Sequence, residues 1–237
     1  MKFSGNLPTV TLVRRYQRFL AEVIDEHGET FVAHCPNTGS MLGCCQPGSQ
    51  AAISLANNPA RKYRYTLEMV RQDGVWIGVN SARANTLIAE ALAAGRIDGF
   101  DQSWQIQAEV KAPGGSRLDF RLRRGAENVY LEVKSCSLAL NGRAMFPDAK
   151  TERGRRHLVE LMNLTAAGQG AAILFLAQRQ DTTSFAPADH IDSEYGQALR
   201  QAAAMGVRVL AYDCAVSPAG IKTRRAYPVS SKWCETI

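Results

Sequence analysis

Residues 116–135, SRLDFRLRRGAENVYLEVKS, contain two stretches in which apolar and polar side chains alternate, RLDFRLRR and VYLEVK. This period of two is typical of β-strands, whose successive side chains point to opposite faces of a sheet. The letters RGAEN between them, which include Gly125, predict a hairpin turn. Asp119 on the first strand then shares a polar face with Glu132 and Lys134 on the second.

The register of this hairpin decides how close the three side chains come. Residues that face each other in a hairpin have a constant sum of residue numbers. A sum of 251 pairs Asp119 with Glu132 and leaves the loop 124–127, whereas a sum of 253 pairs Asp119 with Lys134 and leaves the loop 125–128. Loops of this length are common in hairpins. Either register brings the two carboxylates and the amine together.

Two carboxylates and a lysine in this arrangement predict a metal site. Carboxylate oxygens such as those of Asp119 and Glu132 are ligands that Mg²⁺ or Mn²⁺ prefers. A bound cation polarises a phosphodiester and acidifies a water molecule, and the Lys134 ammonium can orient that water or stabilise developing charge. An exposed ladder of ion pairs across a hairpin explains the same residues. The pattern alone leaves both interpretations open.

The tripeptide Glu-Val-Lys occurs twice, at residues 109–111 and at residues 132–134. The first copy runs directly into a turn, APGGS, and the acids before it, Asp98 and Asp101, lie in a predicted loop. We therefore assign the chemistry to the second copy. The first copy remains a candidate contributor, because its strand is expected to pair with the first strand of the hairpin.

Outside the hairpin, the chain divides at about residue 80. Beyond that point the order is a helix, three strands, a helix, a strand, a helix and a strand, which predicts an α/β domain with a mixed sheet. The helical stretches are SARANTLIAEALAAG, TERGRRHLVELMNLTAAG and DSEYGQALRQAAAMG. Before residue 80, short strand-like runs such as TFVAHCP and RYTLEMV are separated by Pro, Gly and Asn, and they predict a small barrel or sandwich.

The composition is that of an ordinary globular chain with a mild excess of positive charge. Of 237 residues, 46% are hydrophobic and 21% are charged, and the net charge of +6 favours anionic partners such as nucleic acid. No apolar run is long enough for a membrane helix or a signal peptide, so we expect a cytoplasmic protein with no membrane partner. Six cysteines without C-x-x-C spacing predict free thiols in a reducing compartment. They are Cys35, Cys44, Cys45, Cys136, Cys214 and Cys234.

Several longer stretches resemble one known family. SRLDF, YLEVKS and FPDAKTERGRRHLVEL, together with HCPNTGSM at residues 34–41 and HIDSEYGQALRQAAAMGVRVLAY, are similar to the sugar fermentation stimulation protein family (SfsA). The resemblance spans nearly the whole chain. It implies an all-β, OB-like, DNA-binding barrel over residues 1–80 and a PD-(D/E)xK nuclease-like α/β domain with a mixed sheet over residues 81–237. It also implies a bacterial DNA-binding protein tied to the regulation of sugar metabolism.

Individual residues of this chain fall on the nuclease motif that the resemblance implies. Asp119, Glu132 and Lys134 occupy its two acids and its lysine, with Leu118 where the motif has proline. Domains of this type also carry an acidic residue on the helix before the strands, and Glu90 matches it by position. A solvated helix face is the alternative explanation, because glutamate is a good helix former anywhere.

The helical stretch TERGRRHLVELMNL places polar residues on one face. Arg153, His157 and Glu160 stand at i, i+4 and i+7. We expect Arg153 and His157 to contact a phosphate or the water beside the metal near Lys134, and a polar helix face with mutual support is the alternative. Asp148 in FPDAK is expected to be a turn or cap residue.

Cations and aromatic rings in the N-terminal half are candidates for binding nucleic acid. LVRRYQRF interleaves arginines with aromatic residues, a mixture suited to phosphates and stacked bases. The turn in HCPNTGSM offers backbone N–H groups for a phosphate. Ordinary strand, turn and surface roles explain the same residues. The candidate nucleic-acid-binding residues are Arg14, Arg15, Tyr16, Arg18, His34, Asn37, Thr38, Arg61 and Lys62, with Arg117 and Arg153 from the second half.

Two functions follow from these observations. The first is a DNA-binding protein with an Mg²⁺- or Mn²⁺-dependent nuclease-type site, in which Asp119 and Glu132 hold the metal. Lys134, His157 and Glu90 join these two acids as catalytic residues. The second function is a non-catalytic, DNA-binding transcriptional regulator that keeps the nuclease fold. RNA is a further candidate partner, and the sequence predicts no oligomeric state. A sugar-handling enzyme has no support, since neither a kinase loop nor a paired glycosidase cleft is present.

Overall fold

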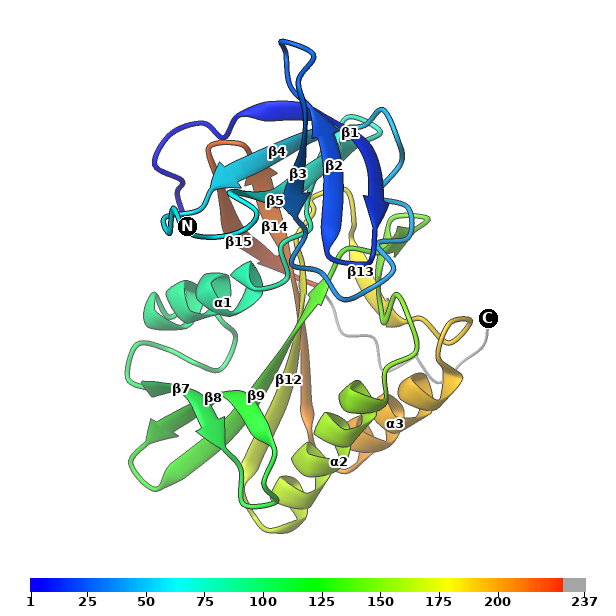
Figure 1. Ribbon diagram of the computed structural model, residues 1–237. Coiled ribbons are helices and arrows are strands. Elements are labelled where there is room, and N and C mark those ends of the chain that lie inside the picture. The colour runs from blue at the N-terminus through cyan, green and yellow to red at the C-terminus, as the bar shows by residue number, and fades with distance from the viewer. Residues whose placement is uncertain (228–237) are drawn as a thin grey trace.

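The computed structural model describes residues 1–227, which form a β-barrel joined to an α/β domain (Figure 1). Residues 228–237, with Cys234 and the end of the expected second domain, lie outside the described residues. The described cysteines are all free thiols, as expected. Within residues 1–227, the helices are too short or too polar to cross a membrane.

Five strands of the N-terminal part close into a barrel, which confirms the expected OB-like fold. The strands pair in the order β3-β2-β1-β4-β5, and a parallel pairing of Ala33 with Tyr65 between β3 and β5 closes the ring. Side chains such as Leu12, Val23 and Leu67 are fully buried and form the apolar interior that a small barrel needs. The strands are β1 (Thr9–Tyr16), β2 (Leu20–Ile24), β3 (Thr30–His34), β4 (Gln50–Leu55), β5 (Tyr65–Gln72) and β6 (Val75–Gly78), which extends β5 as a hairpin.

The second part is built on a mixed six-stranded sheet, as expected. Its order is β15-β14-β12-β9-β8-β7, with β9, β12 and β14 parallel and the strands toward both edges antiparallel. Its strands are β7 (Gln105–Lys111), β8 (Arg117–Arg124), β9 (Glu127–Cys136), β12 (Gly170–Ala177), β14 (Arg208–Ser217) and β15 (Gly220–Ala226). A smaller sheet contains β10 (Ala139–Leu140), β11 (Arg143–Phe146) and β13 (Ser184–Pro187).

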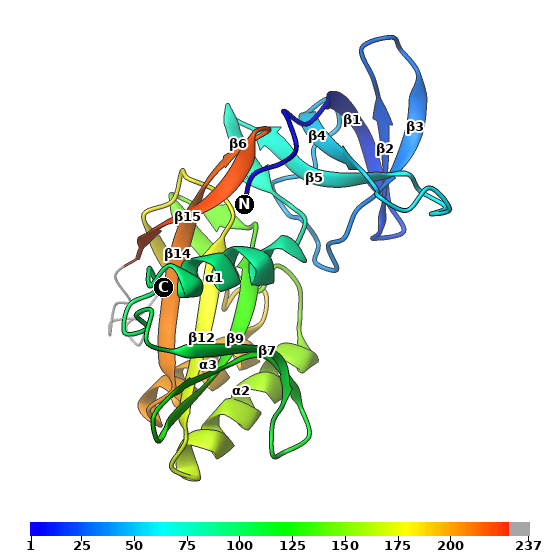
Figure 2. The same ribbon diagram turned by 90° about the vertical axis from the view of Figure 1, so that its left-hand side faces the viewer.

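Helices cover both faces of this sheet (Figure 2). Helix α1 (Arg83–Ala93) packs Leu87 and Ile88 on one face, in a core with Leu131 and Leu174. Helices α2 (Glu152–Ala166) and α3 (Ser193–Ala204) cover the other face, in a core around Leu158, Phe175 and Leu199. The strand β9 therefore runs between α1 and α2, with core on both sides.

The β8–β9 hairpin has the register 251, because Phe120 pairs with Leu131 and Arg124 with Glu127. The expected four-residue loop is wrong: the pairing leaves only Gly125 and Ala126, and Gly125 takes a φ of 57° that a residue without a side chain adopts without strain. At the other end the pairing stops at Phe120. Asp119 therefore lies at the point where β8 leaves β9.

Candidate active site

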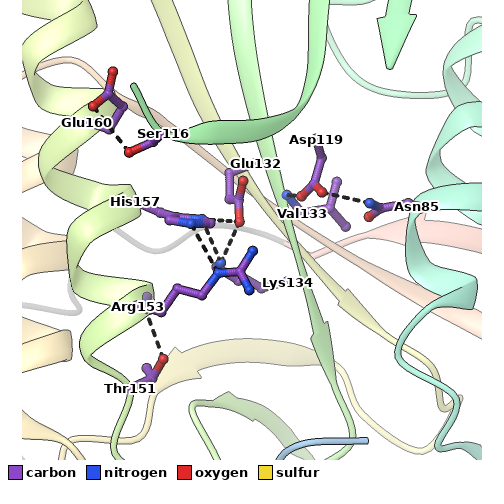
Figure 3. Close-up of polar contacts among 11 residues, drawn as sticks. Asn85, Ser116, Asp119, Glu132, Val133, Lys134, Thr151, Arg153, His157 and Glu160 are labelled. Atoms are coloured by element: carbon purple, nitrogen blue, oxygen red, sulfur yellow. Dashed lines mark hydrogen bonds and ion pairs between the residues drawn. The ribbon is translucent and has the colours of Figure 1, made fainter. Parts of the chain in front are cut away.

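Side chains from both parts of the molecule line one pocket of about 360 Å³ beside the separated ends of β8 and β9. Figure 3 shows the acids and their neighbours from the second part. The barrel contributes the loop after β3, and the second part contributes α1, the two strands, the loop before α2 and α2 itself. The lining residues that bear on its chemistry are Asn37, Thr38, Gly39, Asn85, Asp119, Glu132, Lys134, Asp148, Arg153 and His157.

Asp119 takes the place of a backbone pairing between the two strands. Its Oδ2 accepts a hydrogen bond from the backbone N–H of Val133 at 2.7 Å, and its Oδ1 accepts one from Nδ2 of Asn85 on α1 at 2.7 Å. Burial raises the pKa of Asp119, and the negative charge of Glu132 adds to the rise, while the two hydrogen bonds partly offset it. Asp119 is thus a carboxylate whose charge is only partly compensated.

Glu132 lies on the other side of the strand, facing α2, and is only 3% exposed. Its Oε1 accepts a hydrogen bond from Nζ of Lys134 at 2.6 Å and one from Nδ1 of His157. Burial by itself raises the pKa of Glu132, but the hydrogen bond from His157 and the charge of Lys134 outweigh it, and the pKa lies below its ordinary value. Its Oε2 is buried and has no hydrogen-bond partner among the described residues.

The hydrogen bonds around His157 assign its tautomer. Nε2 accepts a hydrogen bond from Nε of Arg153 at 3.5 Å, so the ring proton sits on Nδ1 and is donated to Glu132. The Lys134 ammonium, 3.3 Å from Nδ1, then directs its own hydrogen bond to Glu132. Nζ of Lys134 and Nδ1 of His157 thus converge on one oxygen of Glu132.

Most of the expected catalytic residues come together in this pocket. Asp119, Glu132, Lys134 and His157 all line it, and the alternative of an exposed ion-pair ladder does not fit the burial of Glu132. The two acids approach from opposite sides of the sheet, not from one shared polar face, because Asp119 contacts α1 and Glu132 contacts α2. The strand separation at Asp119 is what lets them meet.

Glu90 is the exception among the expected catalytic residues. Its carboxylate forms an ion pair with the amino group of Met1 at 2.5 Å, and the side chain is 44% exposed, outside the pocket. The α1 residue that reaches the acids is Asn85. The expected catalytic role of Glu90 is therefore wrong in its geometry, and Asn85 takes the position on the helix.

Glu109, from the first Glu-Val-Lys copy, also lies outside the pocket. It pairs with Arg117 at 2.5 Å, and both side chains are more than two-thirds exposed. This is the ordinary surface pair that the alternative interpretation described. Arg117, expected to bind nucleic acid, is engaged in the same pair.

The residues expected to bind nucleic acid, those of the barrel and Arg153 on α2, lie in several different surroundings. Arg15 is a structural brace, because its guanidinium donates to the backbone oxygens of Arg18, Asn37, Gly39 and Ser40 and thereby shapes the loop 37–40. Asn37, Thr38 and Arg153 line the pocket. His34 and Arg61 line a second cavity, and Lys62 lies outside both cavities. Arg14 pairs with Glu22 and lies over the ring of Tyr16. Arg18 is exposed on the turn after β1.

Asp148, expected to be a turn or cap residue, instead joins the two parts at the pocket. Its Oδ2 accepts a hydrogen bond from the backbone N–H of Met41 at 2.9 Å, and its backbone oxygen accepts one from the hydroxyl of Ser40 at 2.5 Å. Gly39 lies so close that a Cβ there would be 2.2 Å from Oδ1 of Asp148. No local pattern could reveal this contact, since the partners are more than 100 residues apart.

The donor set of the pocket fits a divalent cation. Oε2 of Glu132 is a buried acceptor without a partner, and Asp119 lies in the same pocket with incompletely compensated charge. Among residues 1–227, no three His, Cys, Asp or Glu side chains gather into a complete metal-holding group. A cation that takes one or two carboxylates and fills its remaining positions with water or phosphate oxygens matches such a set, and Mg²⁺ behaves in this way.

Two family models match the chain. The SfsA N-terminal OB domain matches residues 13–79, and the sugar fermentation stimulation protein RE domain matches residues 82–220. The chain belongs to the sugar fermentation stimulation protein family. The sequence resemblance is thereby confirmed over most of its length.

Individual members of the family show how far the likeness extends. A sugar fermentation stimulation protein homolog of Geotalea daltonii is 48% identical over 223 residues, which cover 94% of this chain and 96% of that protein. A homolog of Desulfotalea psychrophila is 46% identical over 216 residues, covering 91% and 92%. The structure of Pyrococcus furiosus SfsA in complex with Ca²⁺ matches with a TM-score of 0.88 over 96% of both chains at 24% identity, and this likeness shows the shared fold.

Proposed function

We propose that this protein is a divalent-cation-dependent phosphodiesterase that binds and cleaves DNA. The observation that carries the proposal is the pair of acids in one pocket, with Oε2 of Glu132 buried and unpartnered and Asp119 beside it. Leaving a buried acceptor without a partner costs about 1–3 kcal/mol. Such a cost is compensated when a ligand binds there.

Asp119 and Glu132 are the residues that hold the cation in this proposal. A bound divalent cation polarises the phosphodiester and lowers the pKa of a water molecule at the site. The Ca²⁺ in the P. furiosus SfsA structure supports a divalent cation in this fold, and Mg²⁺ or Mn²⁺ are the physiological ions we propose here. No other cofactor is needed.

The remaining pocket residues act through charge and hydrogen bonds. Lys134 presents an ammonium next to the acids, where it stabilises the negative charge that develops on a phosphate oxygen. His157 donates a hydrogen bond from Nδ1 to Glu132. This bond favours the ionised carboxylate and fixes its orientation, so we assign His157 a positioning role. Arg153 and Thr38, which line the same pocket, are placed to contact a phosphate.

A second candidate is a non-catalytic DNA-binding regulator in the cytoplasm. One observation favours it: the described residues include no complete group of three side-chain ligands for a metal. The names of the relatives, sugar fermentation stimulation protein homologs, describe a regulatory effect and fit either candidate. In both, cationic side chains bind phosphates, and DNA affinity falls steeply as salt rises.

The two Glu-Val-Lys copies supply a matched test. Purified protein is incubated with single-stranded DNA, duplex DNA and RNA in Mn²⁺, Mg²⁺ or EDTA, and cleavage is followed by denaturing gel. We expect Mn²⁺- or Mg²⁺-dependent cleavage that Glu132→Gln abolishes and Glu109→Gln leaves unchanged, since Glu109 lies in an exposed pair outside the pocket. If wild type cuts none of these substrates, or if Glu132→Gln cuts as well as wild type, the phosphodiesterase proposal is wrong.

A further inference from the structure

A second cavity lies between the barrel and the N-terminal segment. Its volume is about 1200 Å³, and its walls are residues 2–8, parts of the β4–β5 connection at residues 56–64 and of the strands beside it, and the residues around the start of α1. We call it the N-terminal groove. Residues 2–8 are fastened beside β15, because Lys2 forms a bridge with Gly220 and Phe3 N–H donates to Ala219 at 3.2 Å (Figure 2). The groove is thus a feature of the folded molecule.

The groove and the active-site pocket adjoin each other. Ala82, at the start of α1, lines both. Two pairs of consecutive residues also divide between the cavities. Pro36 lines the groove and Asn37 the pocket, and Asn80 lines the groove and Ser81 the pocket. Ala82 is therefore the point at which the groove and the pocket meet.

The groove carries an excess of positive charge. Lys2, Arg61 and Arg64 line it, and none of them forms an ion pair among the described residues. Arg83 lines it as well, but its charge is matched by Glu68, whose buried carboxylate it contacts at 2.6 Å. The sum is four cations minus one acid, or +3. The connection at 56–64 joins the fourth and fifth strands, and the corresponding loop of OB barrels takes part in binding oligonucleotides.

We propose that the N-terminal groove binds a single strand of nucleic acid and leads it across Ala82 to the acids. The inference rests on the proposed function and names its substrate class: single strands, or the unpaired end of a duplex. A duplex is a stiff rod over many base pairs, and its phosphates cannot enter a pocket of about 360 Å³ whose Glu132 is 3% exposed. One flexible strand can bend into it.

The first test measures binding without cleavage. A fluorescent oligonucleotide of about 16 nucleotides, the upper end of the range that one OB barrel covers, is titrated by anisotropy in EDTA at several salt concentrations. Three cations without ion pairs among the described residues predict a salt slope of about 2, and Arg64→Ala lowers it by about 0.7. Lys62→Ala is the matched control, because Lys62 is exposed on the same connection and lies outside the groove.

DNA and RNA present the same phosphates, so oligo-dT and oligo-rU are titrated in parallel. Equal slopes for the two mean that the groove takes either strand, and a slope confined to one identifies the strand. A matched hairpin duplex without overhangs is expected to bind more weakly than both. If Arg64→Ala and Lys62→Ala change the slope equally, or neither changes it, the groove is not the binding surface.

The second test blocks the path. Ala82 is exposed and has helix-compatible dihedrals, so Ala82→Trp places a large ring between the two cavities without changing charge or the fold. Ala82 lines the pocket as well as the groove, so the comparison is between two substrates: we expect cleavage of the oligonucleotide to fall at least about tenfold further than hydrolysis of bis(p-nitrophenyl) phosphate in Mn²⁺, which needs only the pocket. Equal cleavage of the oligonucleotide by wild type and variant overturns the path.

The two assays separate this inference from the proposed function. Hydrolysis of the small phosphodiester by wild type, together with unaltered salt slopes in Arg64→Ala, keeps the phosphodiesterase and rejects the groove. Altered slopes together with no hydrolysis of any substrate keep the groove as a strand-binding surface and reject the phosphodiesterase.

Discussion

The contact between Gly39 of the barrel and Asp148 of the second part predicts a strongly non-additive pair of substitutions. A Cβ on Gly39 would lie 2.2 Å from Oδ1 and 2.3 Å from Oδ2 of Asp148, well inside van der Waals contact. Gly39→Ala therefore pushes the loop 37–41 away from that carboxylate. The movement breaks the hydrogen bond from the backbone N–H of Met41 to Oδ2 of Asp148.

The magnitude follows from the groups that lose their partners. A hydrogen bond to a charged acceptor contributes about 2 kcal/mol. Replacing glycine by alanine stabilises the folded state by about 0.5 kcal/mol, because it lowers the conformational entropy of the unfolded chain. Gly39→Ala should thus lower the free energy of unfolding by about 1.5 kcal/mol. Asp148→Ala loses the same hydrogen bond and removes the three atoms that lie nearest to the added Cβ. In that background Gly39→Ala should stabilise by about 0.5 kcal/mol, a coupling of about 2 kcal/mol.

Urea unfolding of wild type, both single variants and the double variant measures this coupling directly. At this chain length a change of 2 kcal/mol corresponds to roughly 6 °C in Tm, so thermal scans give an independent reading. Gly5→Ala is the control, because a Cβ at Gly5 meets nothing within 4 Å, and it should add to Asp148→Ala without coupling. Additivity of Gly39→Ala with Asp148→Ala to within about 0.5 kcal/mol refutes the docked geometry of the pocket wall.

Further expectations concern the acids and the cations. Burial raises the pKa of Glu68, but the hydrogen bonds from Arg83 and its neighbours bring it below the ordinary 4.5. The stability that this pairing adds is complete above about pH 4.5 and is lost as pH falls through the folded pKa. The difference in unfolding free energy between wild type and Glu68→Gln should therefore disappear in acid, and a difference that persists there contradicts the pairing. Lys134→Met should lower phosphodiester hydrolysis by about 10²-fold or more while Mn²⁺ still raises Tm, and hydrolysis near the wild-type rate rejects its role. Asp119→Asn should unfold no more readily than wild type in EDTA, because burial and Glu132 already disfavour the charge of Asp119. The variant should lose the Tm increase with Mn²⁺, and a full Mn²⁺ response removes Asp119 from the metal site. Glu90→Gln should change the rate of hydrolysis by less than about twofold, since its half-exposed carboxylate pairs with Met1 and does not line the pocket, and a large loss restores it as a catalytic candidate.

The hairpin shows how much of the site local patterning can determine. The alternation in residues 117–124 and 129–134 places Asp119, Glu132 and Lys134 near one another in any register compatible with both strands. The observed register was one of the two expected. The separation of β8 from β9 at Asp119 was not visible, because it depends on the neighbouring helices, and it is what sends the two acids to α1 and α2.

Helix α1 illustrates what a periodic pattern leaves undetermined. Asn85 and Glu90 are five positions apart, which at 3.6 residues per turn places them about 140° from each other around the axis. The apolar residues of the helix define its buried face, but which flank of that face lies beside Asp119 depends on how the helix crosses the sheet. A glutamate that fits the family pattern by number therefore ended on the wrong flank, and a less conspicuous asparagine took the contact.

Long-range contacts account for the other differences. Arg15 was expected to bind phosphate because it is a cation among aromatic residues, yet four backbone oxygens of its own barrel occupy its guanidinium. Asp148 has a turn-like local sequence, yet it holds the barrel loop against the second part. Composition shows that a charge is present, but only the fold shows whether another group has already satisfied it.

The same criterion separates the acids of the pocket from the other charged groups of the chain. Asp213, fully buried, is satisfied by Arg224 and Arg225, and Glu68 by Arg83. Glu132 has donors on one oxygen only, and Asp119 has neutral donors and a neighbouring negative charge. The other buried acids of residues 1–227 have donors on both carboxylate oxygens, Glu160 among them through Gly114 and Ser116, so the bare Oε2 of Glu132 beside Asp119 is the exception. In the function proposed above, one cation would compensate both acids, and that proposal accounts for the buried, unpartnered Oε2 of Glu132.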